Sequence, residues 1–138
     1  MKRQYVLYVA WFTAMAAMLG SLYFSEVLKL PPCVLCWYQR ILMYPLVVLI
    51  PVGILSLDEK IDRYILSLSI PGMFVAFYHY LLYVKILPDS LVPCTTGVSC
   101  TTRLIEWFGF INTPLLSFLS FAFITLLMLI YRKQNGAQ

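Results

Sequence analysis

The sequence has few charged residues: Asp, Glu, Lys and Arg make up 12% of its 138 residues, whereas 62% are hydrophobic. Soluble domains carry about 25% charged and about 45–50% apolar residues. The scarcity of charge therefore excludes a water-soluble globular domain, and the high apolar content excludes disorder. The sequence also lacks internal repeats, low-complexity segments and a basic patch suited to nucleic acid. We expect one domain over residues 1–138 and no nucleic-acid partner.

Four long runs contain no charged residue at all, at residues 5–25, 41–57, 64–84 and 107–131. Each is close to the ~20 residues that a helix needs to cross the ~30 Å hydrocarbon layer of a bilayer. In the last run, Asn112-Thr113-Pro114 is typical of a helix start, so this span is expected at residues 114–131. We predict an all-α integral membrane four-helix bundle in the lipid bilayer. Its outer loops are expected at residues 26–40 and 85–113.

The first span and the basic residues predict the orientation. Lys2 and Arg3 precede an apolar run as in a signal peptide, but this run has 21 residues, against ~7–15 in a signal-peptide core. We therefore expect an uncleaved span, and four spans place both termini on one side. Six basic residues lie on that side and four on the other, which predicts cytoplasmic termini: Lys2, Arg3, Lys60, Arg63, Arg132 and Lys133 against Lys29, Arg40, Lys85 and Arg103.

The four cysteines lie in the two predicted outer loops, Cys33 and Cys36 in one and Cys94 and Cys100 in the other. On an oxidising side of the membrane, thiols pair readily. The even division predicts two local disulfides, although three connectivities remain open from the sequence alone. Four cysteines could instead bind one Zn²⁺. An oxidising compartment works against such a thiolate site, so we expect no metal.

The first cysteine pair lies where the second span begins. Pro32 suits the first turn of a helix, which places Cys33 at the N-terminus, where unpaired N–H groups favour a thiolate. Cys36 and Arg40 follow on the same helical face, and the guanidinium could stabilise a thiolate or bind a reduced oxygen. A CxxC motif at a helix start is typical of exchange-active disulfides. The structural alternative is a disulfide that only closes the base of a loop.

The second pair, Cys94 and Cys100, encloses a small polar ring with Gly97 in a turn-rich segment. Alone, such a pair is more typical of a structural disulfide. The nine residues from Lys85 to Cys94 can reach up to ~30 Å, far enough to bring this pair over the first. Because it faces a CxxC motif, we interpret it as the second half of a redox relay.

His79 is the only histidine, and it lies within the third predicted span. Ionisable residues inside a membrane are costly and are candidates for function. His79 lies six residues before Lys85, which places it about 9 Å below the outer boundary at 1.5 Å per residue. The alternative is a neutral histidine that only bonds to a neighbouring helix.

The motif CVLCWYQR at residues 33–40, the four spans and the second outer cysteine pair together resemble the DsbB family of disulfide bond formation proteins. The short chain and the compact ring between Cys94 and Cys100 resemble its BdbC-type branch. This resemblance covers nearly the whole chain. It implies a multi-pass plasma-membrane thiol:quinone oxidoreductase with its active cysteines on the extracytoplasmic face. Such proteins reoxidise an extracytoplasmic thioredoxin-fold thiol oxidase and pass two electrons to the membrane quinone pool, menaquinone or ubiquinone.

The same resemblance implies an order within the relay. A thiolate of the partner would attack Cys94, and Cys100 would then react with Cys33. Two other functions stay open: a vitamin-K-epoxide-reductase-like quinone reductase, and a non-catalytic membrane subunit whose disulfides only hold the outer loops. The residues implied at the quinone are Cys36, Arg40 and His79.

Overall fold

The computed structural model describes residues 2–27, 29, 34–86, 106–107 and 111–136. A π-helical turn and a short antiparallel strand pair accompany its long helices. All four long helices are apolar enough to cross a membrane, which confirms the predicted all-α membrane bundle. The elements are α1 (Lys2–Leu22), η1 (Tyr23–Val27), α2 (Val34–Ser56), α3 (Ile61–Tyr83), β1 (Glu106–Trp107), β2 (Ile111–Asn112) and α4 (Thr113–Gly136).

The helices extend beyond the charge-free runs that predicted them. α2 begins at Val34, next to the helix start expected at Cys33, so the helix runs through residues 34–40 of the predicted outer loop. Charge did not end the helix there, because Arg40 finds hydrogen-bond partners on α1. α4 continues to Gly136 because basic side chains are favourable in the last turns of a helix. The strand pair β1–β2, within the expected loop at residues 85–113, was not anticipated.

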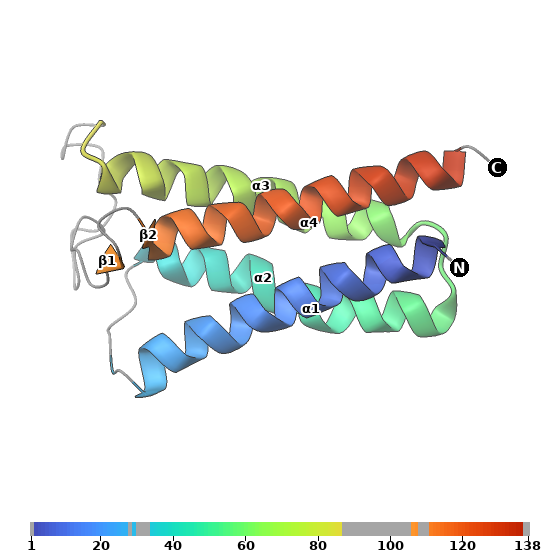
Figure 1. The fold of residues 1–138 in the computed structure, drawn as a ribbon, viewed down its shortest axis with the longest axis horizontal. Coiled ribbons are helices and arrows are strands. Elements are labelled where there is room, and N and C mark those ends of the chain that lie inside the picture. The colour runs from blue at the N-terminus through green and yellow to red at the C-terminus, as the bar shows by residue number, and fades with distance from the viewer. Residues whose placement is uncertain (1, 28, 30–33, 87–105, 108–110, 137–138) are drawn as a thin grey trace.

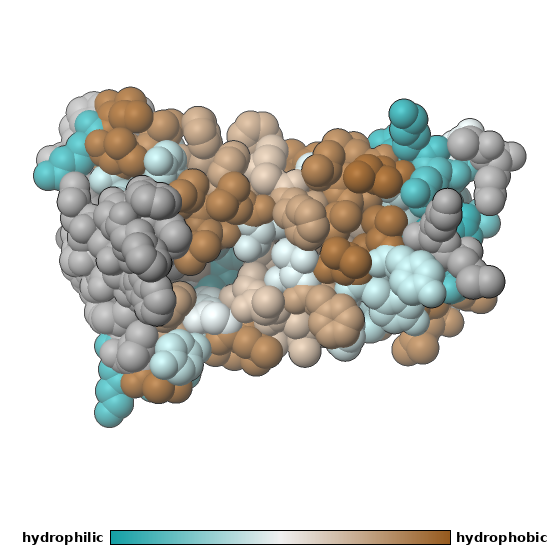
Figure 2. Space-filling model, viewed as in Figure 1, coloured by the Kyte–Doolittle hydropathy of each residue, from teal (hydrophilic) through white to brown (hydrophobic). Residues whose placement is uncertain are grey.

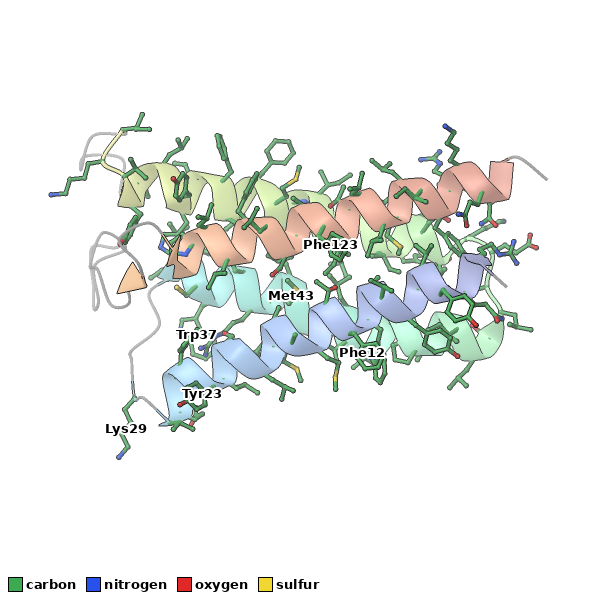
Figure 3. The ribbon with its side chains drawn as sticks, in the orientation of Figure 1. Phe12, Tyr23, Lys29, Trp37, Met43 and Phe123 are labelled. Atoms are coloured by element: carbon green, nitrogen blue, oxygen red, sulfur yellow. The ribbon has the colours of Figure 1, made fainter. Side chains whose placement is uncertain are left out.

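The four helices run alternately up and down, as Figure 1 shows, and each packs against the next while α4 closes against α1. Both termini lie at one end of the bundle, as an even number of spans requires. The start of α2 and the end of α3 lie at the other end, called here the site end. In Figure 2, apolar residues cover the middle of the visible face and hydrophilic residues gather toward its ends. Exposed aromatic side chains such as Phe12 and Phe123 belong to this apolar surface (Figure 3).

Close packing between neighbouring helices depends on glycine. A Cβ atom on Gly72 of α3 would meet the ring of Phe121 from α4, with Cζ at 2.6 Å. Phe121 itself is fully buried. Gly53 of α2 approaches Ile61 of α3 in the same way. Small residues allow such approaches between membrane helices, where van der Waals packing replaces the hydrophobic effect as the source of association.

Hydrogen bonds between helices satisfy polar groups that the bilayer cannot. Pro51 has no N–H, so the carbonyl of Val47 lacks its usual helical donor. The indole Nε1 of Trp11 on α1 donates to this carbonyl at 3.1 Å. Between α3 and α4, the hydroxyl oxygens of Ser69 and Thr125 lie 3.0 Å apart. Each contact joins two helices at a fixed depth.

At the end of the bundle that carries the termini, the side-chain amide of Asn135 makes two hydrogen bonds to other parts of the chain. Arg3 Nη1 donates to Asn135 Oδ1 at 2.6 Å, and Asn135 Nδ2 donates to the carbonyl of Glu59 at 3.1 Å. The guanidinium of Arg3 also lies 5.9 Å from the ring centroid of Tyr131. These contacts connect α1, α4 and the turn between α2 and α3.

We expect Gly72→Ala to lower the free energy of unfolding by about 1–3 kcal/mol, because the methyl group overpacks the contact with Phe121. Gly20→Ala is the matched control, since nothing lies within 4 Å of a Cβ at that position of α1. The control should be neutral or gain up to about 1 kcal/mol from the helix propensity of alanine. Thermal unfolding of the purified protein in detergent measures both. Equal stability of the two variants would contradict the packing described here.

Candidate functional site

Cys36 lies in the first turn of α2, half-buried, at the site end of the bundle. It packs against an apolar cluster that includes Leu35 from its own helix and Leu82 from α3. Val75 and Tyr78 of α3 complete this cluster. Its sulfur therefore has an apolar environment of the kind that suits a lipid-soluble reactant.

The other three cysteines lie outside the described residues. For Cys33, Cys94 and Cys100, the expected disulfides and the order of the relay therefore stay predictions. Within the part of the chain that the structure describes, no three His, Cys, Asp or Glu side chains gather as a metal site would need. This finding does not test the four-cysteine zinc alternative, since three of those cysteines are not included.

Arg40 lies one helical turn after Cys36, and α1 holds its guanidinium in place. Nε donates to Ser21 Oγ at 2.8 Å and Nη2 donates to the Ser21 carbonyl at 3.0 Å. That carbonyl lies just before η1, where the helix passes from α-helical to π-helical hydrogen bonding. The guanidinium also lies 5.5 Å from the ring centroid of Trp37. Figure 3 shows Trp37 at the end of the bundle that also carries Tyr23.

His79 is buried on α3, and its ring is held by Gln39 of α2. Gln39 Nε2 lies 2.9 Å from His79 Nδ1, and both side chains are less than 8% exposed. An amide NH₂ group can only donate, so Nδ1 accepts and the proton of a neutral ring lies on Nε2. The structure thus gives His79 the bond across helices that the structural alternative expects, and it also fixes which nitrogen can donate.

Cys36, Gln39 and Arg40 are spaced i, i+3 and i+4, so they share one face of α2. From this face, Arg40 reaches α1 and Gln39 reaches α3. In Figure 2, a small hydrophilic area is set back between the apolar surfaces of α1 and α4, and α2 lies behind that gap in Figure 1. The site therefore combines polar groups from three helices with an apolar surround.

Sequence reasoning gave no role to Gln39 or Ser21. Gln39 is the only amide side chain of α2, three residues after Cys36, and that position was the available signal. Ser21 carried no comparable signal, because serine is common in membrane helices and its partner is 19 residues away.

The chain is similar throughout its length to proteins of disulfide bond formation. The family model described as disulfide bond formation protein DsbB matches residues 2–131. Disulfide bond formation protein C of Bacillus subtilis is 44% identical over 94% of this chain and 94% of its own length. A probable disulfide formation protein C of Halalkalibacterium halodurans is 43% identical over 91% and 92%. A probable disulfide formation protein of Metapseudomonas resinovorans is 37% identical over 94% and 91%. No solved structure matches the chain significantly.

The contact between Gln39 and His79 predicts a single ring tautomer. Because His79 is the only histidine, ¹⁵N-histidine labelling reports on this ring alone, and the spectrum should show a protonated Nε2 and an unprotonated Nδ1. Gln39→Leu removes the donor, so the tautomers should mix and the free energy of unfolding should fall by about 1–3 kcal/mol.

Gln4→Leu, at an exposed position of α1, is the control and should leave the ring signals unchanged. A Gln39→Leu spectrum identical to that of the parent would show that another group fixes the tautomer.

Proposed function

The chain belongs to the DsbB family of disulfide bond formation proteins, and from this premise we propose that it is a membrane thiol:quinone oxidoreductase. In this proposal it reoxidises an extracytoplasmic thioredoxin-fold thiol oxidase and passes the electrons to menaquinone or ubiquinone. The relatives are named for disulfide formation, which favours this function over a vitamin-K-epoxide-reductase-like reductase or a purely structural subunit. We also propose the plasma membrane as its location, with cytoplasmic termini and with the cysteines on the opposite face.

The observation that carries the proposal is how many hydrogen-bond donors of the Arg40 guanidinium are in use. A guanidinium has five N–H donors, and two of those of Arg40 bond to Ser21, which leaves three without a hydrogen-bond partner among the described residues. Arg40 lies one turn after Cys36, and Cys36 packs against the apolar cluster of Leu35 and Leu82. A quinone needs an apolar site with donors for its carbonyl oxygens, so these residues fit it. When bound, a quinone supplies an acceptor for two electrons and two protons.

The residues of the chain itself prepare this chemistry. The positive charge of Arg40, one turn from Cys36, stabilises negative charge on the sulfur. Ser21 holds the guanidinium on the Cys36 face, so the charge cannot swing away to the membrane surface. Gln39 donates to Nδ1 of His79, so the N–H of a neutral ring lies on Nε2, which makes that nitrogen a hydrogen-bond donor.

The proposed relay moves electrons by thiol–disulfide exchange, and each step breaks one S–S bond and forms another. A partner thiolate attacks Cys94 and releases Cys100 as a thiolate. The second partner thiol then releases Cys94, so the partner gains a disulfide and this pair becomes reduced. Cys100 next attacks Cys33 and releases Cys36 as the thiolate beside Arg40, and Cys94 then attacks Cys100. The second pair is thereby oxidised again, and the first pair holds the two electrons.

We expect Arg40→Lys to raise the apparent KM for quinone by roughly 10- to 150-fold, the loss of one charge-assisted hydrogen bond of about 1.5–3 kcal/mol. Lysine keeps the charge but cannot reproduce the planar fork that bonds to Ser21 and a ligand at once. Exchange between the cysteine pairs should continue, because it does not need the quinone. Steady-state assays over a range of quinone concentrations measure the effect.

Arg63→Lys, an exposed substitution near the start of α3, is the matched control and should behave like the parent. If Arg40→Lys turns over quinone like the parent, Arg40 only anchors α2 to α1 and the quinone binds elsewhere.

Cys100→Ala should trap a mixed disulfide between Cys94 and the soluble partner, because the sulfur that completes the exchange is missing. The free thiolate of Cys94 attacks the disulfide of an oxidised thioredoxin-fold oxidase and releases the second partner sulfur as a thiol. Non-reducing gel electrophoresis after incubation with this oxidised partner detects the adduct. Cys94→Ala is the control and should form none. Accumulation of the adduct in Cys94→Ala instead would reverse the order of the two cysteines.

A further inference from the structure

The hydroxyl group of Tyr44 is buried inside the membrane bundle and, among the residues that the structure describes, has no hydrogen-bond partner. The ring of Tyr44 packs against the apolar core. A buried hydroxyl without a partner is unfavourable compared with a hydrogen atom at the same place, so phenylalanine would suit this core better. Packing alone therefore does not explain a tyrosine here.

Among the described residues, no other buried hydroxyl lacks a hydrogen-bond partner. The side chains of Thr13, Ser56 and Ser120 each donate to the carbonyl four residues earlier in their own helix. A tyrosine hydroxyl is too far from its own backbone to do the same. One other buried polar atom lacks a partner, Gln134 Oε1, but it lies in the last turn of α4, at the opposite end of the bundle.

The helical register places Tyr44 on the stripe of the proposed quinone site. Cys36, Arg40 and Tyr44 are spaced i, i+4 and i+8 on α2, so they follow one another along one side of the helix. Long side chains in a helix lean toward its N-terminus, which for Tyr44 is the direction of Arg40. Arg40 leans the same way, toward Trp37, and the two residues are about one turn apart, ~6 Å along the axis. This spacing is similar to the separation of the two carbonyl oxygens across a 1,4-quinone ring.

We propose that Tyr44 donates a hydrogen bond to the second carbonyl oxygen of the quinone whose first carbonyl oxygen is bound by Arg40. The inference rests on the proposed function and refines it. It specifies an acceptor with two oxygens on opposite sides of its ring, lying along α2. Cys36, Arg40 and Tyr44 then form one binding stripe on one helix.

The test measures binding without turnover, on the full-length protein with its cysteines fully oxidised so that no electrons flow. The probe is 2,3-dimethyl-1,4-naphthoquinone, whose blocked ring cannot be alkylated by thiols. Tyr44→Phe should raise the dissociation constant by about 2- to 10-fold, the loss of one neutral hydrogen bond. Without quinone, the variant should unfold at the same temperature as the parent or higher. Tyr38→Phe, which removes an exposed hydroxyl from the same helix, should change neither quantity.

The other possible results show whether the role of Tyr44 or the proposed function itself is wrong. Equal affinity of Tyr44→Phe and the parent overturns the role of Tyr44 but leaves the proposed function standing. A lower unfolding temperature of quinone-free Tyr44→Phe overturns it too, since the hydroxyl then bonds to the protein. Failure of the parent to bind any quinone overturns the proposed function itself.

A measurement on the parent alone decides the case if the variant does not fold. The infrared spectrum of the ¹³C-carbonyl-labelled probe should show both carbonyl stretches lowered by hydrogen bonding when it is bound. One lowered and one unperturbed band would overturn the role of Tyr44.

Discussion

The absence of water inside a bilayer is the constraint on which the rest of this structure depends. Polar groups at that depth must find partners within the protein, and apolar surfaces gain little by leaving lipid for one another. The bundle is accordingly joined by close packing at small residues such as Gly72 and by specific polar contacts between helices. The bond from Trp11 to the carbonyl that Pro51 leaves without a donor shows how strictly this applies even to one backbone oxygen.

Because polar groups need partners inside the bilayer, the contacts that stabilise the bundle also position the residues of the site. Arg40 would be costly at its depth without Ser21, and His79 would be costly without Gln39. The contacts that make these residues tolerable also determine where the guanidinium points and which imidazole nitrogen carries the proton. Because α2 makes both contacts from one face, it positions the proposed chemistry and also joins α1 to α3.

A site carried by helices can be held more precisely than one carried by loops. Cys36 lies in the first turn of α2, and the polar groups of the site come from α1, α2 and α3. The apolar cluster around Leu35 and Leu82 keeps this part of the bundle suited to a reactant that arrives from the lipid. Tyr44 fits this arrangement as the one hydroxyl on the stripe whose partner the described chain does not supply.

The sequence by itself determined the number of spans, the common end of both termini and the placement of Cys36, Arg40 and His79 toward one side of the membrane. These features follow from local composition and length, because a bilayer of fixed thickness converts each apolar run into a helix across it. The tertiary structure decided that Gln39 faces His79, that Ser21 holds Arg40 and that the hydroxyl of Tyr44 is buried without a partner. Such pairings depend on how far each helix is rotated and shifted against its neighbours, and only the packing of all four helices sets that rotation and shift.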